Sequence, residues 1–486
     1  MGEIVEIRER THNTMARVAE IIQRATTAAA EFRKLDQKQT DAIVRAAYLA
    51  ALGHRVDLAQ MACEETGLGV WQDKVVKNVI ATQLVYEDIK DQRTVGVISV
   101  DPKNGMEEVA QSIGPILGFT PVTNPTSTTI FKALIALKTR NPLIISPAMA
   151  ARKCTSAALD ICYQAARGAG APEHCLQCMD RASEDTITEM MSDHHLSLIL
   201  ATGTNSTVRK AYRSGKPTIG VGPGNVPVYI GRTADIGFAV ENVMRSKTFD
   251  NGTVCASEQA IVVKQDTAAA VIAEFKKHGA YFMNPEEIEK VGAVAYDQER
   301  RTMKAGVVGQ PVSEIARSAG ITVPEGTRLL IGQLDGVGPE YPISAEILAP
   351  ILAFYVERDF DTAIERCSEI TRFGGVGHTA VIYSNTDERI EYFSRTIQAG
   401  RILVNMPSTY GALGGMYNTL SPSFTLSCGS GANNTTTDNI TVRHLLNIHR
   451  ITRRRPNPRW LSFDQSKYLD SGISAEGIES EYNRNF

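Results

Sequence analysis

The stretch GFTPVTNPTSTTIFKALIALKTRNPLIISP, residues Gly118–Pro147, indicates the fold of this chain. Apolar runs at Gly114–Pro121 and Leu143–Ser146 have the length and composition of buried strands. The segment Thr126–Thr139 between them has the apolar spacing of a helix. The stretch therefore predicts a strand–helix–strand unit with a right-handed crossover and two parallel strands in one sheet.

The same alternation continues along the chain. Further strands are predicted at Cys175–Met179, Leu196–Ala201, Thr218–Val221, Glu258–Val263, Arg328–Ile331, Leu352–Val356, Ala380–Tyr383 and Arg401–Asn405. Further helices are predicted at Ala150–Ala166, Ser183–Ser192, about Phe238–Met244 and Thr267–His278. A second α/β stretch begins near Ile236. This pattern predicts an α/β protein with two Rossmann-like lobes, each built on a parallel sheet.

Two regions depart from the alternation. Residues 1–90 carry helical patterns, for example at Asp41–Leu52, which ends at Gly53. Residues 95–110 contain an Asn104-Gly105 turn between two alternating runs, which is a strong hairpin signal. We expect this hairpin and the C-terminal end of the chain to form a small β element for oligomerisation.

Composition excludes several classes of protein. The 486 residues are 43% apolar and 22% charged, which is typical of a globular protein with a sizeable core. The net charge of −3 and the lack of a long apolar run predict neither a nucleic-acid nor a membrane partner. Eight scattered cysteines and an N-terminal segment without the apolar core of a signal peptide predict a cytoplasmic protein.

The segment SKTFDNGTVCASEQAIVV, Ser246–Val263, contains the first candidate catalytic residue. Cys255 follows a loop with Asn251-Gly252 and precedes an apolar strand. Such a turn can expose a thiol beside unpaired backbone N–H groups that bind an oxyanion. The alternative is a cysteine that only packs in the core.

Asn124 is the second candidate. Asn124-Pro125 ends a predicted strand, and we expect Thr126 or Ser127 to cap the following helix. An amide at a strand end is a plausible donor to a developing oxyanion. The alternative is an asparagine that only forms a turn.

Weaker signals lie in three further segments. In LILATGTNSTV, Leu198–Val208, a strand, a turn at Gly203 and a helix start have the geometry of a pyrophosphate site, although an ordinary βα turn explains them equally well. Gly222 lies in a glycine cluster that either approaches a ligand closely or only turns the chain. Glu346 in EILAP and His378 in GGVGHT are candidates whose alternatives are a solvated carboxylate and a structural histidine.

A metal site is not expected. Cys175 and Cys178 form a CxxC pair, but no second Cys or His pair lies at zinc-site spacing. We expect both to be strand residues.

Together these motifs resemble the CoA-acylating aldehyde dehydrogenases, and in particular the aldehyde dehydrogenase half of bifunctional aldehyde–alcohol dehydrogenases. The motifs that stand in the order of that family are TPVTNPTST, KTRN with SP, ATGT, GKPTIGVGPGN, SKTFDNGTVCASEQ, EILAP, GVGHT and RILVNMPS. The resemblance implies an aldehyde-dehydrogenase-like fold. It places a nucleotide-binding domain at residues 1–235, a catalytic domain at 236–425, and a return to the cofactor domain with an oligomerisation strand and tail at 426–486.

The resemblance also assigns chemical roles. Cys255 would attack the aldehyde and carry the acyl group as a thioester, which the thiol of coenzyme A then attacks. The Asn124 side chain and the Cys255 backbone N–H would bind the oxyanion. His378 is a further candidate for catalysis or for the CoA site.

The implied cofactor is NAD or NADP, with coenzyme A as co-substrate. The residues that the resemblance places at the cofactor are Thr123, Ser146, Pro147, Gly203, Thr204, Gly222, Glu346 and Leu348. Glu346 matches the residue that anchors the nicotinamide ribose. The segments SPAMAA and TGTNSTV differ from the relatives, so the choice between NAD and NADP stays open.

Hydrolytic relatives carry a glutamate that activates water, and Val221 stands at that place in our alignment. We therefore expect reversible conversion of a short aldehyde, first of all acetaldehyde, to its acyl-CoA. One alternative is an anionic or functionalised aldehyde such as sulfoacetaldehyde, since an acid that relatives carry near Gly415 is missing. The others are a hydrolytic semialdehyde dehydrogenase and a non-catalytic scaffold.

We expect the partners to be a small aldehyde, CoA and further copies of the chain, as a homodimer or homotetramer. The polar tail 465–486 offers an alternative role, docking on a bacterial microcompartment shell or on an enzyme that produces the aldehyde.

Overall fold

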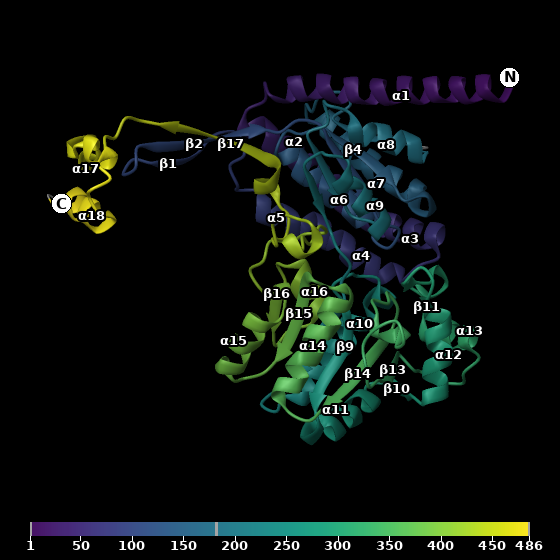
Figure 1. Cartoon of the computed structure of the whole chain (residues 1–486). Coiled ribbons are helices and arrows are strands. Elements are labelled where there is room, and N and C mark those ends of the chain that lie inside the picture. The colour runs from purple at the N-terminus through teal and green to yellow at the C-terminus, as the bar shows by residue number, and fades with distance from the viewer. Residues whose placement is uncertain (1, 180–182, 485–486) are drawn as a thin grey trace. The chain divides into compact units, whose positions relative to one another are not determined.

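The computed structural model describes the backbone of residues 2–179 and 183–484, with side chains from Arg17 onward apart from Asn205 (Figure 1). The chain forms two compact units. The first contains the residues up to Gln92 together with Ser112–Leu446, and the second contains Arg93–Gln111 and Asn447–Phe486. Among the described residues, no helix has both the length and the apolar composition needed to cross a membrane.

The N-terminal part of the first unit is helical, as predicted. Its helices are α1 (Gly2–Phe32), α2 (Gln37–Gly53), α3 (Arg55–Thr66), α4 (Trp71–Val79) and α5 (Val85–Ile89), and a π-helical turn, η1 (Ile80–Leu84), joins α4 to α5. Asp36 caps α2 through reciprocal hydrogen bonds with Gln39. The predicted end at Gly53 is confirmed.

The first sheet has the strand order β5-β4-β3-β6-β7, and its described strand pairs are parallel. Its strands are β3 (Ile116–Thr120), β4 (Leu143–Pro147), β5 (Leu176–Cys178), β6 (Leu198–Ala201) and β7 (Thr218–Gly220). The helices between them are α6 (Pro125–Lys138), α7 (Arg152–Gly168), α8 (Glu184–Ser192) and α9 (Asn205–Arg213). These elements confirm the predicted strands and helices of this lobe, including the helix start predicted after Gly203, which is the start of α9.

The strand order of this sheet reverses between β3 and β6. From β3 the chain builds outward through β4 and β5, and it then returns to add β6 on the other side of β3. Ligands of α/β proteins bind outside the carboxyl ends of strands at such a reversal. Buried Lys132 of α6 crosses here and donates to the carbonyls of Phe119 (2.5 Å) and Leu200 (2.8 Å), tying the two strand ends together.

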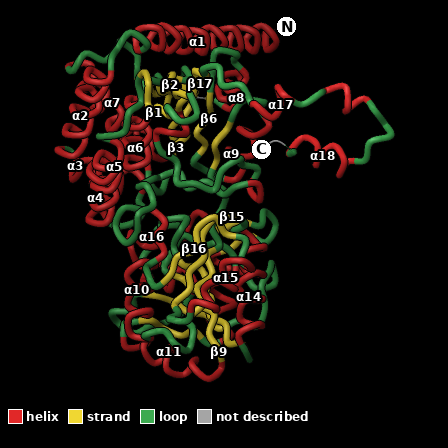
Figure 2. The backbone as a smooth tube through the Cα atoms, turned by 90° about the vertical axis from the view of Figure 1, so that its left-hand side faces the viewer, coloured by secondary structure: helices red, strands yellow, loops and turns green. Residues whose placement is uncertain are grey.

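The second sheet has the order β10-β13-β14-β9-β8-β15-β16, and its described pairs are also parallel. Its strands are β8 (Val226–Ile230), β9 (Glu258–Lys264), β10 (Ala280–Met283), β13 (Leu329–Gln333), β14 (Ile351–Glu357), β15 (Gly377–Tyr383) and β16 (Ala399–Val404). Figure 2 shows the two groups of strands with helices around each of them. The five strands predicted in this lobe are confirmed, whereas β8 and β10 were missed. The short apolar run of β8 follows a Gly- and Pro-rich segment that looked like a turn.

The helices of this second lobe are α10 (Ile236–Thr248), α11 (Gln265–Lys277), α12 (Pro285–Ala295), α13 (Val312–Ala319), α14 (Phe360–Gly374), α15 (Asp387–Thr396) and α16 (Ser408–Leu413). A two-stranded ribbon, β11 (Tyr296–Asp297) with β12 (Thr302–Met303), lies at its side.

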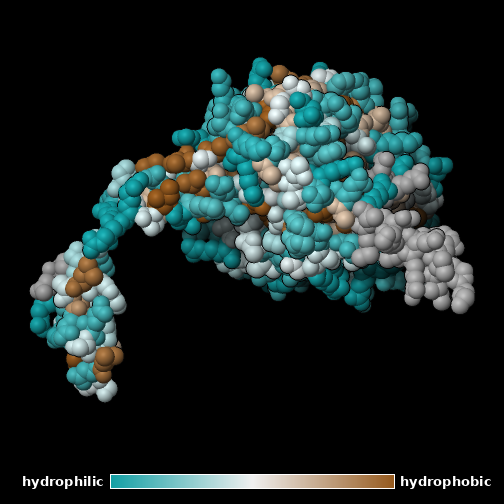
Figure 3. All heavy atoms as spheres, turned by 90° about the horizontal axis from the view of Figure 1, so that it is seen from above, coloured by the Kyte–Doolittle hydropathy of each residue, from teal (hydrophilic) through white to brown (hydrophobic). Residues whose placement is uncertain are grey.

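The second unit contains a three-stranded sheet in the order β1-β2-β17. The strands β1 (Gly96–Asp101) and β2 (Met106–Ser112) form the predicted antiparallel hairpin, and β17 (Leu446–Thr452) is the third strand. Two short helices, α17 (Pro458–Ser462) and α18 (Ala475–Asn483), share an aromatic cluster in which Phe463 contacts Tyr468 and Tyr482. Figure 3 shows apolar residues at the surface of this unit, where Val100, Leu461 and Leu469 are more than half exposed.

Helix α6 lies in the core of the first unit along its whole length, since all of its 14 residues are buried. Its amino end follows β3 directly, so the packing of the helix fixes the segment that carries Asn124. Phe131 is 0% exposed and packs against Phe424.

We predict that Phe131→Ala lowers the free energy of unfolding by about 3–5 kcal/mol, because it leaves a cavity beneath the sheet. Urea denaturation measures this change. Phe131→Leu is the control and should cost less, since it keeps most of the buried volume. A Phe131→Ala protein that unfolds at the parent's urea midpoint would show that α6 is outside the cooperative core.

Candidate active site

The carboxyl ends of strands from the first sheet face the amino ends of strands from the second. Asn124 follows β3, while Cys255 precedes β9 and His378 is the second residue of β15. The two sides touch, because the Asn124 amide nitrogen donates to the Thr253 carbonyl at 3.2 Å. The candidate residues therefore meet between the two sheets, although they are more than a hundred residues apart in the chain.

The loop before Cys255 has an unusual backbone. Asp250, Asn251 and Gly252 have φ values of 50°, 52° and 73°. These values lie in the left-handed region of backbone conformation, which residues other than glycine rarely adopt. Contacts from outside the loop stabilise this strained conformation: Val70 donates its backbone N–H to Asp250 (2.7 Å), and Asn251 donates to the Gly309 carbonyl (2.9 Å). The loop ends at Cys255, which is partly exposed rather than enclosed within the sheet.

The Cys255 thiol is paired with a histidine. Its Sγ lies 3.3 Å from Nε2 of buried His378, whose Nδ1 lies 2.9 Å from the Thr379 hydroxyl. Burial raises the pKa of the Cys255 thiol to about 12, with a further contribution from the Glu346 carboxylate. Burial, and then Arg401, lower the pKa of His378 to about 3. Both groups are therefore neutral at physiological pH.

Gly224 brings Glu346 to the same place. A Cβ on Gly224 would lie 1.8 Å from the Cys255 carbonyl oxygen, so only glycine fits against the cysteine backbone. The Gly224 N–H donates to Glu346 Oε1 at 3.0 Å. Burial raises the pKa of Glu346 to about 7. Glu346 is thus held beside the thiol by the glycine segment that sequence analysis singled out.

Asn124 occupies the N-cap position of α6, but its side chain does not cap the helix. The expected cap by Thr126 or Ser127 is wrong, because the helix begins at Pro125, whose ring presets φ and which has no N–H to satisfy. The Thr126 hydroxyl donates instead to Asn78 (2.9 Å). The Asn124 nitrogen donates instead to the Thr253 carbonyl across the interface and to the Thr123 hydroxyl (3.1 Å), while its oxygen accepts a hydrogen bond from Lys77 Nζ of α4 at 2.7 Å.

The residues predicted at the cofactor lie on both sides of this interface. Five of them lie at or just after the carboxyl ends of β3, β4 and β6, namely Thr123, Ser146, Pro147, Gly203 and Thr204. Thr204 caps α9 by accepting the Thr207 N–H (3.4 Å).

The remaining cofactor candidates lie on loops of the second sheet. Gly222 precedes β8, and Leu348 shares with Glu346 the loop that leads into β14. These positions fit the predicted roles, which remain predictions.

Sequence reasoning missed four charged residues. Asp250 forms ion pairs with Lys74 (2.9 Å) and Lys77 (2.5 Å). Buried Arg401 donates to the His378 carbonyl (2.8 Å). Two signals could have indicated these residues: the lysines spaced i, i+3 in α4, and the Asp of the FDNG motif. In that motif only the nearby cysteine was considered as a site residue.

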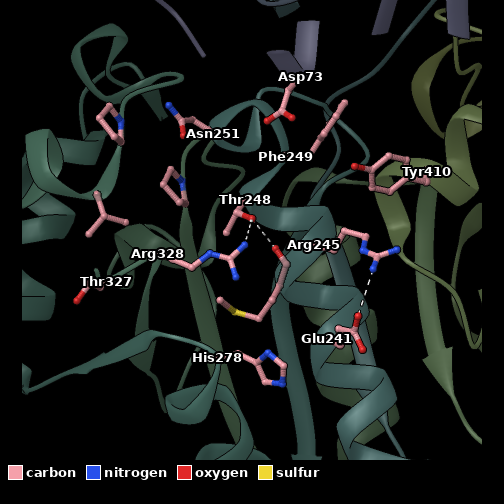
Figure 4. A pocket seen from close by; sticks show the side chains of 14 residues that line it. Asp73, Glu241, Arg245, Thr248, Phe249, Asn251, His278, Thr327, Arg328 and Tyr410 are labelled. Atoms are coloured by element: carbon pink, nitrogen blue, oxygen red, sulfur yellow. Dashed lines mark hydrogen bonds and ion pairs between the residues drawn. The ribbon is translucent and has the colours of Figure 1, made fainter. Parts of the chain in front are cut away.

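A cavity of about 680 Å³ lies beside the same loop, lined by Phe249, Asn251, Arg245 and Arg328 among others (Figure 4). Its lining residues do not include Cys255, so it is not the place where the candidate catalytic groups meet.

One group among the described residues has the composition of a metal site. Asp193, His194 and His195 place ligand atoms within 4.8 Å of one another on the loop before β6. The two histidines are exposed, and these residues lie outside the interface described above.

Comparisons with known proteins agree with this geometry. The chain matches the aldehyde dehydrogenase family over residues 4–418. It is 42% identical over 462 residues to the bifunctional aldehyde-alcohol dehydrogenase AdhE of Escherichia coli (strain K12), with 94% of this chain and 52% of that protein covered. The chain thus spans about half the length of the first curated relatives it matches.

Other relatives are matched over nearly their full length. The sulfoacetaldehyde dehydrogenase (acylating) of Bilophila wadsworthia is 32% identical over 468 residues, which cover 94% of this chain and 98% of that protein. A crystal structure of an acetylating aldehyde dehydrogenase from Geobacillus thermoglucosidasius is 43% identical, with a TM-score of 0.89 over 92% of this chain and 99% of that chain.

These matches confirm the predicted fold and the resemblance drawn from the motifs. A family match over residues 4–418 covers most of the chain. The chain belongs to the aldehyde dehydrogenase family.

Proposed function

We propose that this chain catalyses the reversible CoA-acylating oxidation of a short-chain aldehyde with NAD⁺ or NADP⁺. The observation that carries the proposal is the 3.3 Å contact of the Cys255 thiol with a neutral histidine, opposite an amide donor from the facing sheet. The relatives named as acetylating or acylating enzymes support it. In this proposal residues 1–235 bind the dinucleotide, 236–425 carry the nucleophile, and 426–486 return to the cofactor domain and form the oligomerisation strand and tail.

The chemistry begins at the Cys255–His378 pair. Nε2 of His378 takes the thiol proton as the sulfur attacks the aldehyde carbon, so a C–S bond forms and the carbonyl oxygen gains the electron pair. The Asn124 amide and the Cys255 backbone N–H bind this oxyanion. When bound, the dinucleotide supplies the acceptor for the hydride that the carbon loses. The acyl group then remains on Cys255 as a thioester.

Release of the acyl group regenerates the cysteine. The thiol of CoA gives its proton to a base and attacks the thioester carbon, and the C–S bond to Cys255 breaks. Because the imidazole of His378 lies beside this sulfur, it is placed to receive or return that proton.

The residues present fit a dinucleotide by the chemistry of their donors and acceptors. The Glu346 carboxylate can accept hydrogen bonds from the two hydroxyls of a ribose. The amino end of α9, with Gly203 before it, offers backbone N–H groups to a phosphate. Thr123 and Ser146 lie at the neighbouring strand ends, β3 and β4.

The competing function is hydrolysis of the thioester. Val221, at the place aligned with the water-activating glutamate, is a buried apolar residue and cannot act as a base. Glu346, whose pKa burial raises to about 7, is a carboxyl group beside the thiol and favours this second candidate. The Gly224 hydrogen bond and the proposed ribose contact occupy Glu346, so we favour transfer to CoA.

Acetaldehyde is the substrate we propose first. A sulfonated aldehyde is the alternative, supported by the 32% identity to a sulfoacetaldehyde dehydrogenase. A steady-state comparison of acetaldehyde, propionaldehyde and sulfoacetaldehyde with both nicotinamide cofactors distinguishes these substrates.

We also propose that the chain acts as a homodimer or homotetramer through residues 93–111 and 447–486. In the sheet β1-β2-β17 the outer strands β1 and β17 each have one neighbour among the described residues. Their free edges can pair with another chain, and the exposed side chains of Val100 and Ile451 favour burial there.

CoA dependence tests the reaction. Without CoA, we expect roughly one equivalent of reduced cofactor per active site, because the thioester accumulates. With CoA, turnover should continue and produce acyl-CoA. Cys255→Ala should abolish both signals, whereas Cys428→Ala, at a buried cysteine, should retain turnover. Continuous release of free acid without CoA, lost in Glu346→Gln, would establish hydrolysis instead.

The pH dependence of alkylation tests the neutral thiol. Since the pKa of Cys255 is raised to about 12, the thiolate fraction should rise with pH throughout the neutral range. We predict that labelling of Cys255 by iodoacetamide accelerates roughly 100-fold from pH 7 to pH 9. Mass spectrometry identifies the labelled site, and glutathione is the reference thiol. A plateau below pH 8 would indicate a thiolate stabilised in the free protein, contrary to this prediction.

Light scattering tests the oligomer. We expect a dimer or tetramer, and removal of residues 447–486, which includes most of β17, should give smaller species. Removal of residues 458–486 alone leaves β17 intact and should preserve the oligomer. A full-length monomer would contradict this part of the proposal.

A further inference from the structure

A buried cluster of charges lies behind the candidate oxyanion donor. It consists of Lys74 and Lys77 from α4 and Asp250 from the strained loop before Cys255. The three side chains are 3%, 1% and 0% exposed, respectively. Burying charges costs free energy even when they are paired, so the cluster needs an explanation beyond stability.

Both lysines bind the same atom, Oδ2 of Asp250, but they differ in their other contacts. Lys77 Nζ donates to the Asn124 side-chain oxygen at 2.7 Å and to the Thr253 hydroxyl at 3.0 Å. Lys74 Nζ donates to the Thr123 carbonyl at 3.1 Å. Lys77 thus contacts the amide that the proposed mechanism uses, while Lys74 contacts only the backbone beside it.

The orientation of an amide decides what it can do for an oxyanion. An asparagine side chain presents an acceptor oxygen on one side and a donor NH₂ on the other. With its oxygen bound to Lys77, Asn124 turns its nitrogen toward Thr253 and the Cys255 loop. Rotation by half a turn would present the oxygen there instead, and it would repel a developing negative charge.

We propose that Lys77 is a positioning residue, which holds the Asn124 amide with its nitrogen toward the reacting carbonyl oxygen. This inference rests on the proposed function, because it gives that reaction its oriented donor. Asp250 holds Lys77 in turn. Its carboxylate accepts hydrogen bonds from the two lysines, the Val70 N–H and the Thr253 hydroxyl (2.6 Å).

The cluster also links the two catalytic segments. Asp250 lies five residues before Cys255, and its own N–H donates to Asp73 of α4 at 2.7 Å. The ring of Phe249, next to Asp250, lies with its centroid 5.5 Å from Lys77 Nζ and lines the cavity of Figure 4. Asp250 itself is not among the residues that line the cavity, and its carboxylate binds the two lysines. One ion pair therefore aligns the nucleophile's loop with the amide donor.

The test compares Lys77→Met with Lys74→Met. Each removes one of the two lysine partners of Asp250, but only the first releases the Asn124 amide. We expect Lys77→Met to lower kcat for aldehyde oxidation about 100-fold, the size of a lost oxyanion donor, with KM for the dinucleotide unchanged. Lys74→Met should lower kcat by less than about tenfold, because its side chain does not touch the amide.

A second comparison separates positioning from general damage. In an Asn124→Ala background, Lys77→Met should add little further loss, since the donor it positions is already gone. Alkylation of Cys255 by iodoacetamide needs no oxyanion donor, so its rate should be similar in all of these variants. Equal losses in the two lysine variants, or a full additional loss in the Asn124→Ala background, would overturn the inference.

If Lys77→Met does not fold, two double variants replace the single ones. The first combines Lys77→Met with Asp250→Asn, and the second combines Lys74→Met with Asp250→Asn. These remove the unpaired carboxylate charge, and the same difference in kcat is expected.

If the unaltered protein shows no aldehyde- and CoA-dependent turnover, the proposed function fails by itself. The positioning inference is then decided by crystal structures of the two lysine variants. We expect the Asn124 side chain to leave its contact with the Thr253 carbonyl in Lys77→Met and to keep it in Lys74→Met. Retention of the contact in both would refute the inference.

Discussion

The carboxylate of Asp250 joins the two sides of the candidate active site. It lies on the loop before Cys255, and its partners Val70, Lys74 and Lys77 lie in and just before helix α4. A buried charge without such partners would cost several kcal/mol, so the loop cannot leave α4 without losing all of these bonds together. The left-handed backbone at Asp250 and Asn251 persists because this ion pair, together with the contacts around it, over-determines the loop.

The neutral state of the Cys255–His378 pair has a consequence for reactivity. A thiolate in the free protein would react with any electrophile or oxidant that entered the site. Burial keeps the proton on sulfur and the imidazole uncharged, so in the proposed mechanism the nucleophile forms only when a carbonyl group is present to receive the electron pair. The neutral pair therefore limits side reactions of the thiol when no substrate is bound, although a preformed thiolate would react faster.

Local patterns in the sequence predicted the repeating parts of the structure well. The apolar runs gave the strands of both sheets apart from β8 and β10, and the order of the motifs predicted the family. Asn124 and Cys255 were found because each lies at a strand end or beside a strand, where side chains of these types are informative. The cap of α6 was misassigned because Pro125 can begin a helix without a side-chain cap.

The ion pairs could not be predicted in this way. Asp250 and Lys77 are 173 residues apart, and neither belongs to a local pattern that names the other. Their contact exists only because the carboxyl ends of one sheet meet the amino ends of the other, which is a property of the whole fold. Prediction from sequence therefore named the candidate reacting groups but not the charged residues that contact them.

The close approach of Gly224 to the Cys255 carbonyl limits how the protein can be altered. The nearby glycine segment is an obvious target for redesigning cofactor preference, since it borders the proposed dinucleotide site. At position 224 even a methyl group would overlap the backbone of Cys255. Libraries that vary this segment should therefore keep Gly224 fixed. Variants at this position would be inactive, so their cofactor preference could not be measured.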